Sequence, residues 1–172
     1  MSSTLSRFSI RVCVFAVALQ LVAGAALAQE KTFDVPGKAF KIAITIPNYG
    51  SRGGYAKGEA GRAMAGKDKK REILVEIFSE DIRANINAEE CQDYYKKSIE
   101  TPDRNTIKME QTPKYPLTTF FVEKMVGQTY HQKHMNGYFA HQNVCLEVHV
   151  SKIGYSDSDE APMRAILDSV HF

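Results

Sequence analysis

The chain has 172 residues, 44% of them hydrophobic and 24% charged, with a formal net charge of +2 at pH 7. This length suits one domain of ordinary size with a real core. The near balance of acidic and basic residues gives no support for nucleic-acid binding, which needs a concentrated positive surface.

The N-terminal segment is typical of a secretory signal peptide. Arg7 and Arg11 precede an apolar run that ends in a small-x-small cleavage site at Ala28. The alternative, a membrane anchor, fits less well, because the run is short for a bilayer span and ends in a cleavage signal. We expect removal of residues 1–28. The two arginines leave with that segment, so the mature chain 29–172 has 20 basic and 20 acidic residues and is neutral. The sequence thus predicts a periplasmic or secreted protein without a transmembrane segment after processing.

The mature chain begins with two predicted strands. Phe33 and Val35 form the first, and a Pro-Gly turn follows. In the second, Phe40–Ile46, apolar and polar residues alternate, as expected for a strand with one buried face.

Residues 49–71 differ in composition from the rest of the chain. They hold six of the eleven glycines and seven basic residues against two acidic ones, which predicts a Gly-rich basic loop. Within it, Gly61–Lys67 matches the opening of a phosphate-binding GxxxxGK loop. That motif needs a preceding strand, a Ser or Thr next and a helix after it, whereas here Asp68 follows and a strand comes next. We therefore interpret the segment as a solvated loop that could contact an acidic partner or a lipid headgroup.

A central strand and the first helix follow. Both faces of Ile73–Phe78 are largely apolar, which predicts a strand covered on both sides. Asn87 and Glu90 have the spacing of a capping box, and the residues after them place Cys91 and Tyr95 on one helical face. The predicted helix runs over about 88–100.

The C-terminal half reads as an antiparallel meander and a closing helix. Predicted strands near 107–109, 117–126 and 129–139 lead to a turn at Gln142-Asn143, which would make Gly137 a bulge. In 144–150, four branched apolar residues alternate with Cys145, Glu147 and His149. A polar turn then precedes a helix over 159–169, capped by Ser158 or Asp159, whose apolar stripe must bury against the valine face.

Two cysteines remain after processing, Cys91 and Cys145. In an exported protein, an even number of cysteines favours a disulfide over two buried free thiols. This bridge would place the first helix over the face that carries Cys145, opposite the last helix. The expected class is therefore α+β, an α/β/α sandwich with a central, mostly antiparallel sheet of about six or seven strands. Glu147 and His149 would then lie under or beside the first helix and need partners or solvent.

His131, His134 and His141 suggest a metal site, but the predicted strand argues against one. Residues 131 and 134 point to opposite faces of a strand, so they cannot chelate an ion from one face. We expect no metal or other cofactor.

The segments FDVPGKAFKIAITIP and CLEVHVSKIGYSDSDEAPMRAILDSVHF, with the central helix and strands between them, resemble the PsbP-like α/β/α sandwich family. This family includes the photosystem extrinsic subunit PsbP, the Ran-binding protein Mog and small bacterial envelope proteins of unassigned function. The resemblance spans most of 32–172 and is one of pattern. It implies a non-enzymatic domain that binds or helps assemble a protein partner, and it carries over no binding residues.

Two functions from different classes follow from the sequence. The favoured hypothesis is a periplasmic or secreted binding and assembly domain with a protein partner. The alternative is a hydrolase or metal-dependent enzyme that uses His149 with Glu147, or the three histidines at 131–141.

Overall fold

The computed structural model describes residues 28–50, 62–99, 103–125 and 127–172. The predicted signal peptide therefore lies outside the described residues except for Ala28, which begins the first strand.

The core of the fold is a seven-stranded sheet in which every neighbouring pair is antiparallel. Its order is β3-β4-β5-β9-β8-β7-β6, and β1 and β2 form a second sheet of two strands. The strands are β1 Ala28–Asp34, β2 Lys41–Pro47, β3 Tyr49–Gly50, β4 Arg62–Asp68, β5 Ile73–Asp81, β6 Lys108–Gln111, β7 Pro116–Met125, β8 Gln128–His141 and β9 Val144–Ile153.

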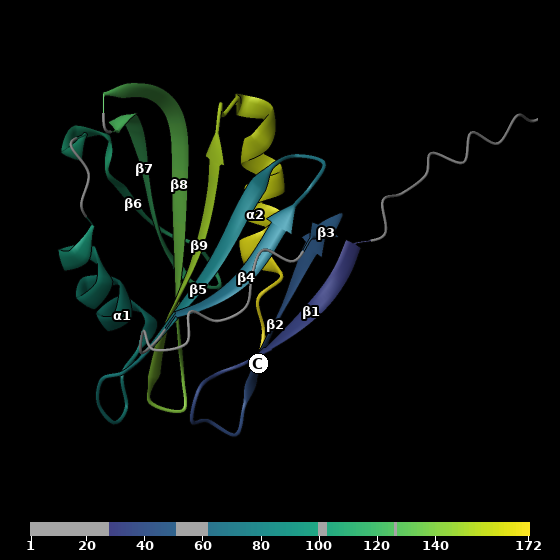
Figure 1. The fold of residues 1–172 in the computed structure, drawn as a ribbon. Coiled ribbons are helices and arrows are strands. Elements are labelled where there is room, and N and C mark those ends of the chain that lie inside the picture. The colour runs from purple at the N-terminus through teal and green to yellow at the C-terminus, as the bar shows by residue number, and fades with distance from the viewer. Residues whose placement is uncertain (1–27, 51–61, 100–102, 126) are drawn as a thin grey trace, which may run out of the picture.

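The helical elements lie outside the sheet. They are α1 Ala88–Tyr95, α2 Glu160–Asp168 and the single 3-10 turns η1 Lys96–Ser98, η2 Arg104–Thr106 and η3 Asp157–Asp159. Figure 1 shows α1 on one side of the large sheet and α2 with the β1–β2 pair on the other. The predicted α+β sandwich is thus present. We call the two sides of the large sheet the α1 face and the α2 face.

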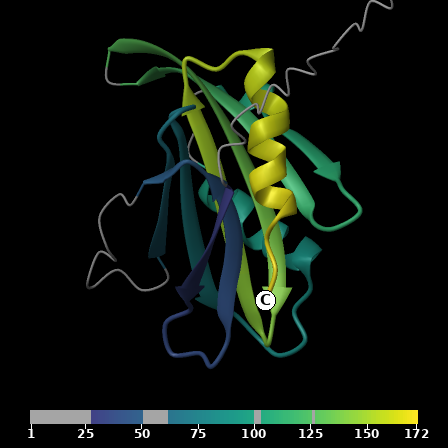
Figure 2. The same ribbon diagram turned by 90° about the vertical axis from the view of Figure 1, so that its right-hand side faces the viewer.

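The α2 face is the larger apolar layer. The four apolar residues of β9 that the sequence placed on one side are all at most 1% exposed, and they pack with buried isoleucines of β2 and the stripe of α2. Figure 2 shows α2 and the β1–β2 pair side by side over this face. Hydrogen bonds hold them together, because Ala43 and His171 exchange two backbone bonds of 2.9 and 3.0 Å and Ser169 Oγ accepts from the Thr45 amide at 2.9 Å.

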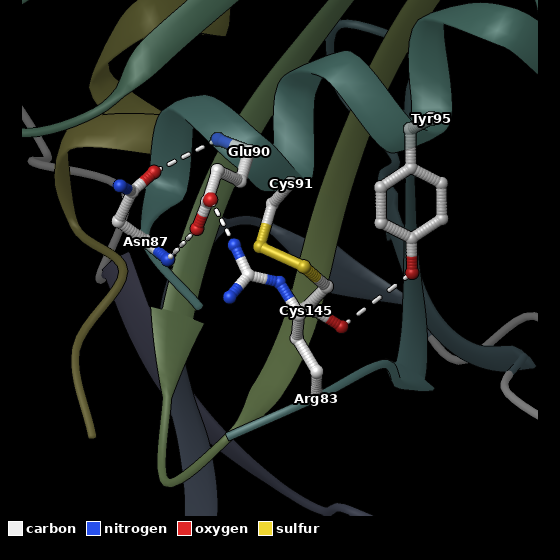
Figure 3. Close-up of a disulfide and its surroundings, with 6 residues drawn as sticks. All are labelled: Arg83, Asn87, Glu90, Cys91, Tyr95 and Cys145. Carbon is white, nitrogen blue, oxygen red and sulfur yellow. Dashed lines mark hydrogen bonds and ion pairs between the residues drawn. A yellow bond between two sulfur atoms is a disulfide. The ribbon is translucent and has the colours of Figure 1, made fainter. Parts of the chain in front are cut away.

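The α1 face is covered at one end through a covalent link. Asn87 caps α1 in the predicted capping box with Glu90, and Cys91 and Tyr95 are buried against the sheet. Cys91 is joined to Cys145 of β9 by a disulfide with a Cα–Cα distance of 5.4 Å. Figure 3 shows the bridge beside the Tyr95 hydroxyl, which donates to the Cys145 carbonyl at 3.5 Å. The helix is shorter than predicted, since it tightens into η1 after Tyr95.

Two local expectations need correction. The range 49–71 is not a loop throughout: it contains β3 and β4, while 51–61 lies outside the described residues. β4 forms because its backbone groups pair with β5, and Gly66 accommodates a register shift at φ +144°.

Gly137 is no bulge but pairs regularly with both neighbouring strands. A Cβ at this position would come within 3.2–3.3 Å of Leu167 and two aromatic rings, so close packing explains the glycine. Asp159 is the N-cap of α2, one of the two caps predicted, but its side chain makes no capping hydrogen bond to that helix; a capping box between Ser156 and Asp159 starts the preceding η3.

The turn at Gln142-Asn143 is confirmed. Both residues have positive φ, 46° and 68°, and His141 pairs directly with Val144 across it. This conformation matches the twist of antiparallel strands, and Asn tolerates it better than most residues do.

Candidate functional site

A row of polar side chains lies on the α1 face, across three adjacent strands. Glu76 comes from β5, Glu147 and His149 from β9, and His134 and Asn136 from β8. The pairing brings them together, because Glu76 lies opposite His149 and His149 lies opposite Asn136. Glu76, Asn136 and Glu147 are at most 9% exposed. Buried charges of this kind need partners, so the contacts within the row decide its chemistry.

Three of these side chains form a linear array. Glu76 Oε2 lies 3.2 Å from His149 Nδ1, and His149 Nε2 lies 2.8 Å from His134 Nδ1. The two imidazole rings are nearly parallel, and the other side of His134 stacks on Phe120 with ring centroids 4.6 Å apart. His134 Nε2 is buried and has no hydrogen-bond partner among the residues that the structure describes. Burial, and secondarily the neighbouring His149, lower the pKa of His134 to about 3, so this ring stays neutral in the folded protein over most of the pH range.

Glu147 lies beside this array with a partner of its own. Asn136 Nδ2 donates to Glu147 Oε1 at 2.7 Å. Burial outweighs the favourable charge of His149 and raises the pKa of Glu147 to about 7. The enzymatic hypothesis required Glu147 to hydrogen-bond His149, but Glu147 accepts from Asn136 instead. That role belongs to Glu76, which is 73 positions away in the sequence.

The structure does not bring the three histidines at 131–141 together. His131 is exposed, lies 3.0 Å from Glu123 and stacks on Phe121. His134 stacks on Phe120, which points to the opposite face of the sheet from Phe121. His141 stacks on Phe172 at a centroid distance of 4.6 Å. Within the described part of the chain, no three His, Cys, Asp or Glu side chains converge as metal ligands.

A second candidate lies at the β3 edge of the fold. A pocket of about 440 Å³ is lined by Gln29, Asn48, Tyr49, Lys69 and Lys70. Gln29 belongs to β1. Asn48 connects β2 to the short β3, and Tyr49 is the first residue of β3. Both lysines directly follow β4. The ammonium groups of both lysines have no acidic partner among the described residues. The pocket therefore offers two cations, two amides and a phenol to a ligand.

Asp68 holds the turn that carries the two lysines. Its Oδ1 accepts from the backbone N–H groups of Lys70 and Arg71 at 2.9 and 3.2 Å, and from Asn48 Nδ2 at 3.2 Å. The residue is fully buried, and the adjacent Lys69 amide donates to the Asn48 carbonyl at 3.2 Å. An aspartate that bonds backbone groups two and three residues ahead fixes a turn. Asp68 therefore fixes the backbone turn that carries Lys69 and Lys70 in the wall of the pocket.

Sequence reasoning missed both Glu76 and Asp68. A signal existed for each: Glu76 is the one charged residue in the middle of an apolar strand, and Asp68 is an isolated acid in a basic run. A charge in such a strand stays buried only if it is paired. The alternation of apolar and polar residues along a strand does not reveal which residue pairs with the buried charge.

The fold is similar to that of cyanobacterial PsbP from Synechocystis sp. PCC 6803, known from a solution structure. The match has a TM-score of 0.53 with 12% sequence identity, and it covers 89% of this chain and 98% of the other. This similarity supports the PsbP-like fold indicated by the sequence pattern. No protein-family model matches the chain, and no curated protein matches it in sequence. Among the helices of the described ranges, none is long and apolar enough to cross a membrane.

Proposed function

We propose that the mature chain is an exported, non-enzymatic domain that binds or helps assemble a protein partner in the periplasm or outside the cell. The PsbP-like fold and the buried disulfide support this proposal, because disulfides persist in oxidising compartments. The observation that carries it is the pocket at the β3 edge, where Lys69 and Lys70 stand on a turn anchored by a buried aspartate.

The chemistry of the pocket favours an acidic segment of the partner. The ammonium groups of Lys69 and Lys70, which have no acidic partner in the described part of the chain, attract carboxylates, and electrostatic complementarity speeds encounter and sets register. The side chains of Gln29, Asn48 and Tyr49 supply hydrogen-bonding groups suited to a peptide's carboxylates and carbonyls. Binding to a flat membrane surface would require only the positive charge of the lysines and would leave these three polar side chains without a role.

The polar row on the α1 face is poorly suited to act as the active site of an enzyme. Both ring nitrogens of His149 are engaged inside the fold, by Glu76 and His134. A general base needs a nitrogen within reach of the substrate's proton.

The experiment is crosslinking in the native envelope followed by mass spectrometry. We expect a protein partner whose crosslinks cluster around the pocket, and loss of most of that capture in the Lys69→Glu/Lys70→Glu variant. The control, Lys97→Glu/Lys108→Glu, changes the net charge equally at exposed positions on η1 and the opposite sheet edge. Equal loss in both variants would refute a localised site, and no partner in wild type would refute the function.

A further inference from the structure

The array formed by Glu76, His149 and His134 has a property that neither partner binding nor folding requires. His149 lies in the middle and uses both ring nitrogens, so the protonation of each end depends on the other. The side chains of Glu76 and His149 are only 10% and 16% exposed, which limits replacement of these bonds by water.

Hydrogen-bond complementarity defines the proton positions at neutral pH. A neutral imidazole has one N–H and one lone pair. With Glu76 ionised, His149 Nδ1 must donate to the carboxylate, so His149 Nε2 is an acceptor. His134 must then carry its proton on Nδ1 and donate it to His149. The remaining nitrogen, His134 Nε2, is left as a bare lone pair, in agreement with its being one of four buried side-chain atoms in the described ranges that have no hydrogen-bond partner.

One added proton rearranges the whole array. If His149 becomes an imidazolium, both of its nitrogens donate, one to Glu76 and one to His134 Nδ1. His134 Nδ1 must now accept, so the single proton of His134 moves to Nε2. The positive charge rests on His149 next to the Glu76 carboxylate, and His134 stays neutral in its other tautomer. The proton comes from solvent, and no bond between heavy atoms changes.

The surroundings make the two states unequal. Among the described residues, Glu147 on β9 interacts electrostatically with both His149 and Glu76. The buried Tyr138 on β8 and Tyr95 on α1 lie near Glu147, and β7 contributes the uncharged Phe120. After the rearrangement His134 Nε2–H is a buried donor without an acceptor. An unsatisfied buried donor is costly.

We infer that Glu76, His149 and His134 form a single-proton switch in which acidification charges His149 and transfers the His134 proton from Nδ1 to Nε2. The switched state has a buried N–H in need of an acceptor, so it favours local opening of the packing of His134 against Phe120. The switch is independent of the proposed partner pocket, which lies at the β3 edge.

The test is a ring-nitrogen NMR titration of the full mature chain with its disulfide intact. We expect His149 and His134 to change in one shared transition, with the nitrogen shifts of His134 exchanging between the two neutral tautomers while His149 becomes an imidazolium. A tautomer exchange is a signature that a merely structural contact would not give.

Two variants sharpen the result. His131→Gln removes an exposed histidine on the other face and should leave the transition unchanged. Glu76→Gln removes the carboxylate that stabilises the charged His149, so the tautomer exchange should be missing at the pH where wild type shows it. If wild-type His134 keeps one tautomer throughout, or the two rings titrate independently, the switch is refuted without recourse to any variant.

Discussion

Glu147→Gln should make the protein more stable at neutral pH than at acidic pH, relative to wild type. Glu147 is 9% exposed, and burial raises the pKa of its carboxyl from an ordinary 4.5 to about 7. The folded state therefore holds this proton more tightly than the unfolded chain does. The favourable contribution is fully present below pH 4.5 and is lost as pH rises through 7. A glutamine keeps the Oε1 acceptor for Asn136 but does not ionise.

The size of the effect follows from the shift. A difference of one pKa unit corresponds to about 1.4 kcal/mol, so the loss in wild type between the two pKa values amounts to about 3 kcal/mol. The free energy of unfolding of Glu147→Gln minus that of wild type should rise by this amount on going from acidic to neutral pH. Taking this difference cancels the titrating groups that do not interact with Glu147.

His134 should give the opposite slope. Burial lowers its pKa from 6.5 to about 3, so its contribution is present above pH 6.5 and is lost as pH falls toward 3. Over the range in which both groups titrate, about 3 kcal/mol from His134 offsets the change at Glu147. Wild type should therefore be nearly flat there, and His134→Asn should reveal the slope of Glu147 alone.

The assay is urea unfolding of the oxidised protein, followed by far-UV circular dichroism from about pH 5 to about pH 8. Glu89→Gln is the matched control, because it makes the same chemical change at an exposed position of α1, and its difference from wild type is the baseline for Glu147→Gln. If the Glu147→Gln difference is flat within 1 kcal/mol relative to this baseline, the inference that burial governs this carboxyl is wrong.

Three further predictions concern the scaffold and use the same unfolding assay. Replacing both Cys91 and Cys145 by alanine should lower the free energy of unfolding by about 4 kcal/mol, since the bridge spans 54 positions; a loss below 1 kcal/mol would contradict the loop-entropy argument. Asn87→Ala should cost about 1 kcal/mol through the lost cap, with the amide of residue 90 exchanging faster; unchanged exchange would show that the cap is dispensable. Gly66→Ala should cost at least 1 kcal/mol more than Gly37→Ala, because both have positive φ but only the former places a Cβ 2.5 Å from a tyrosine carbon and 2.9 Å from a carbonyl oxygen. Equal costs would contradict the argument from these two close contacts.

The sequence by itself determined the faces of the last strand and the elements next to it. Alternation in 144–150 placed the valines on one side and Cys145, Glu147 and His149 on the other, and the structure has the same division. The capping pair at the start of α1, the turn at Gln142-Asn143 and the opposite directions of His131 and His134 were also predictable. Each depends on local backbone geometry or on the two-residue period of a strand, which a short window of sequence contains.

Only the tertiary structure decided which strands are neighbours. β5 lies beside β9, and this pairing makes Glu76, rather than the nearby Glu147, the partner of His149. The pairing of β4 with β5 likewise turned part of a Gly-rich basic segment into a strand and anchored Asp68 under the pocket lysines. Strand order is set by the packing of the whole chain, because any amphipathic strand can pair with several others and the burial of the complete core selects among them.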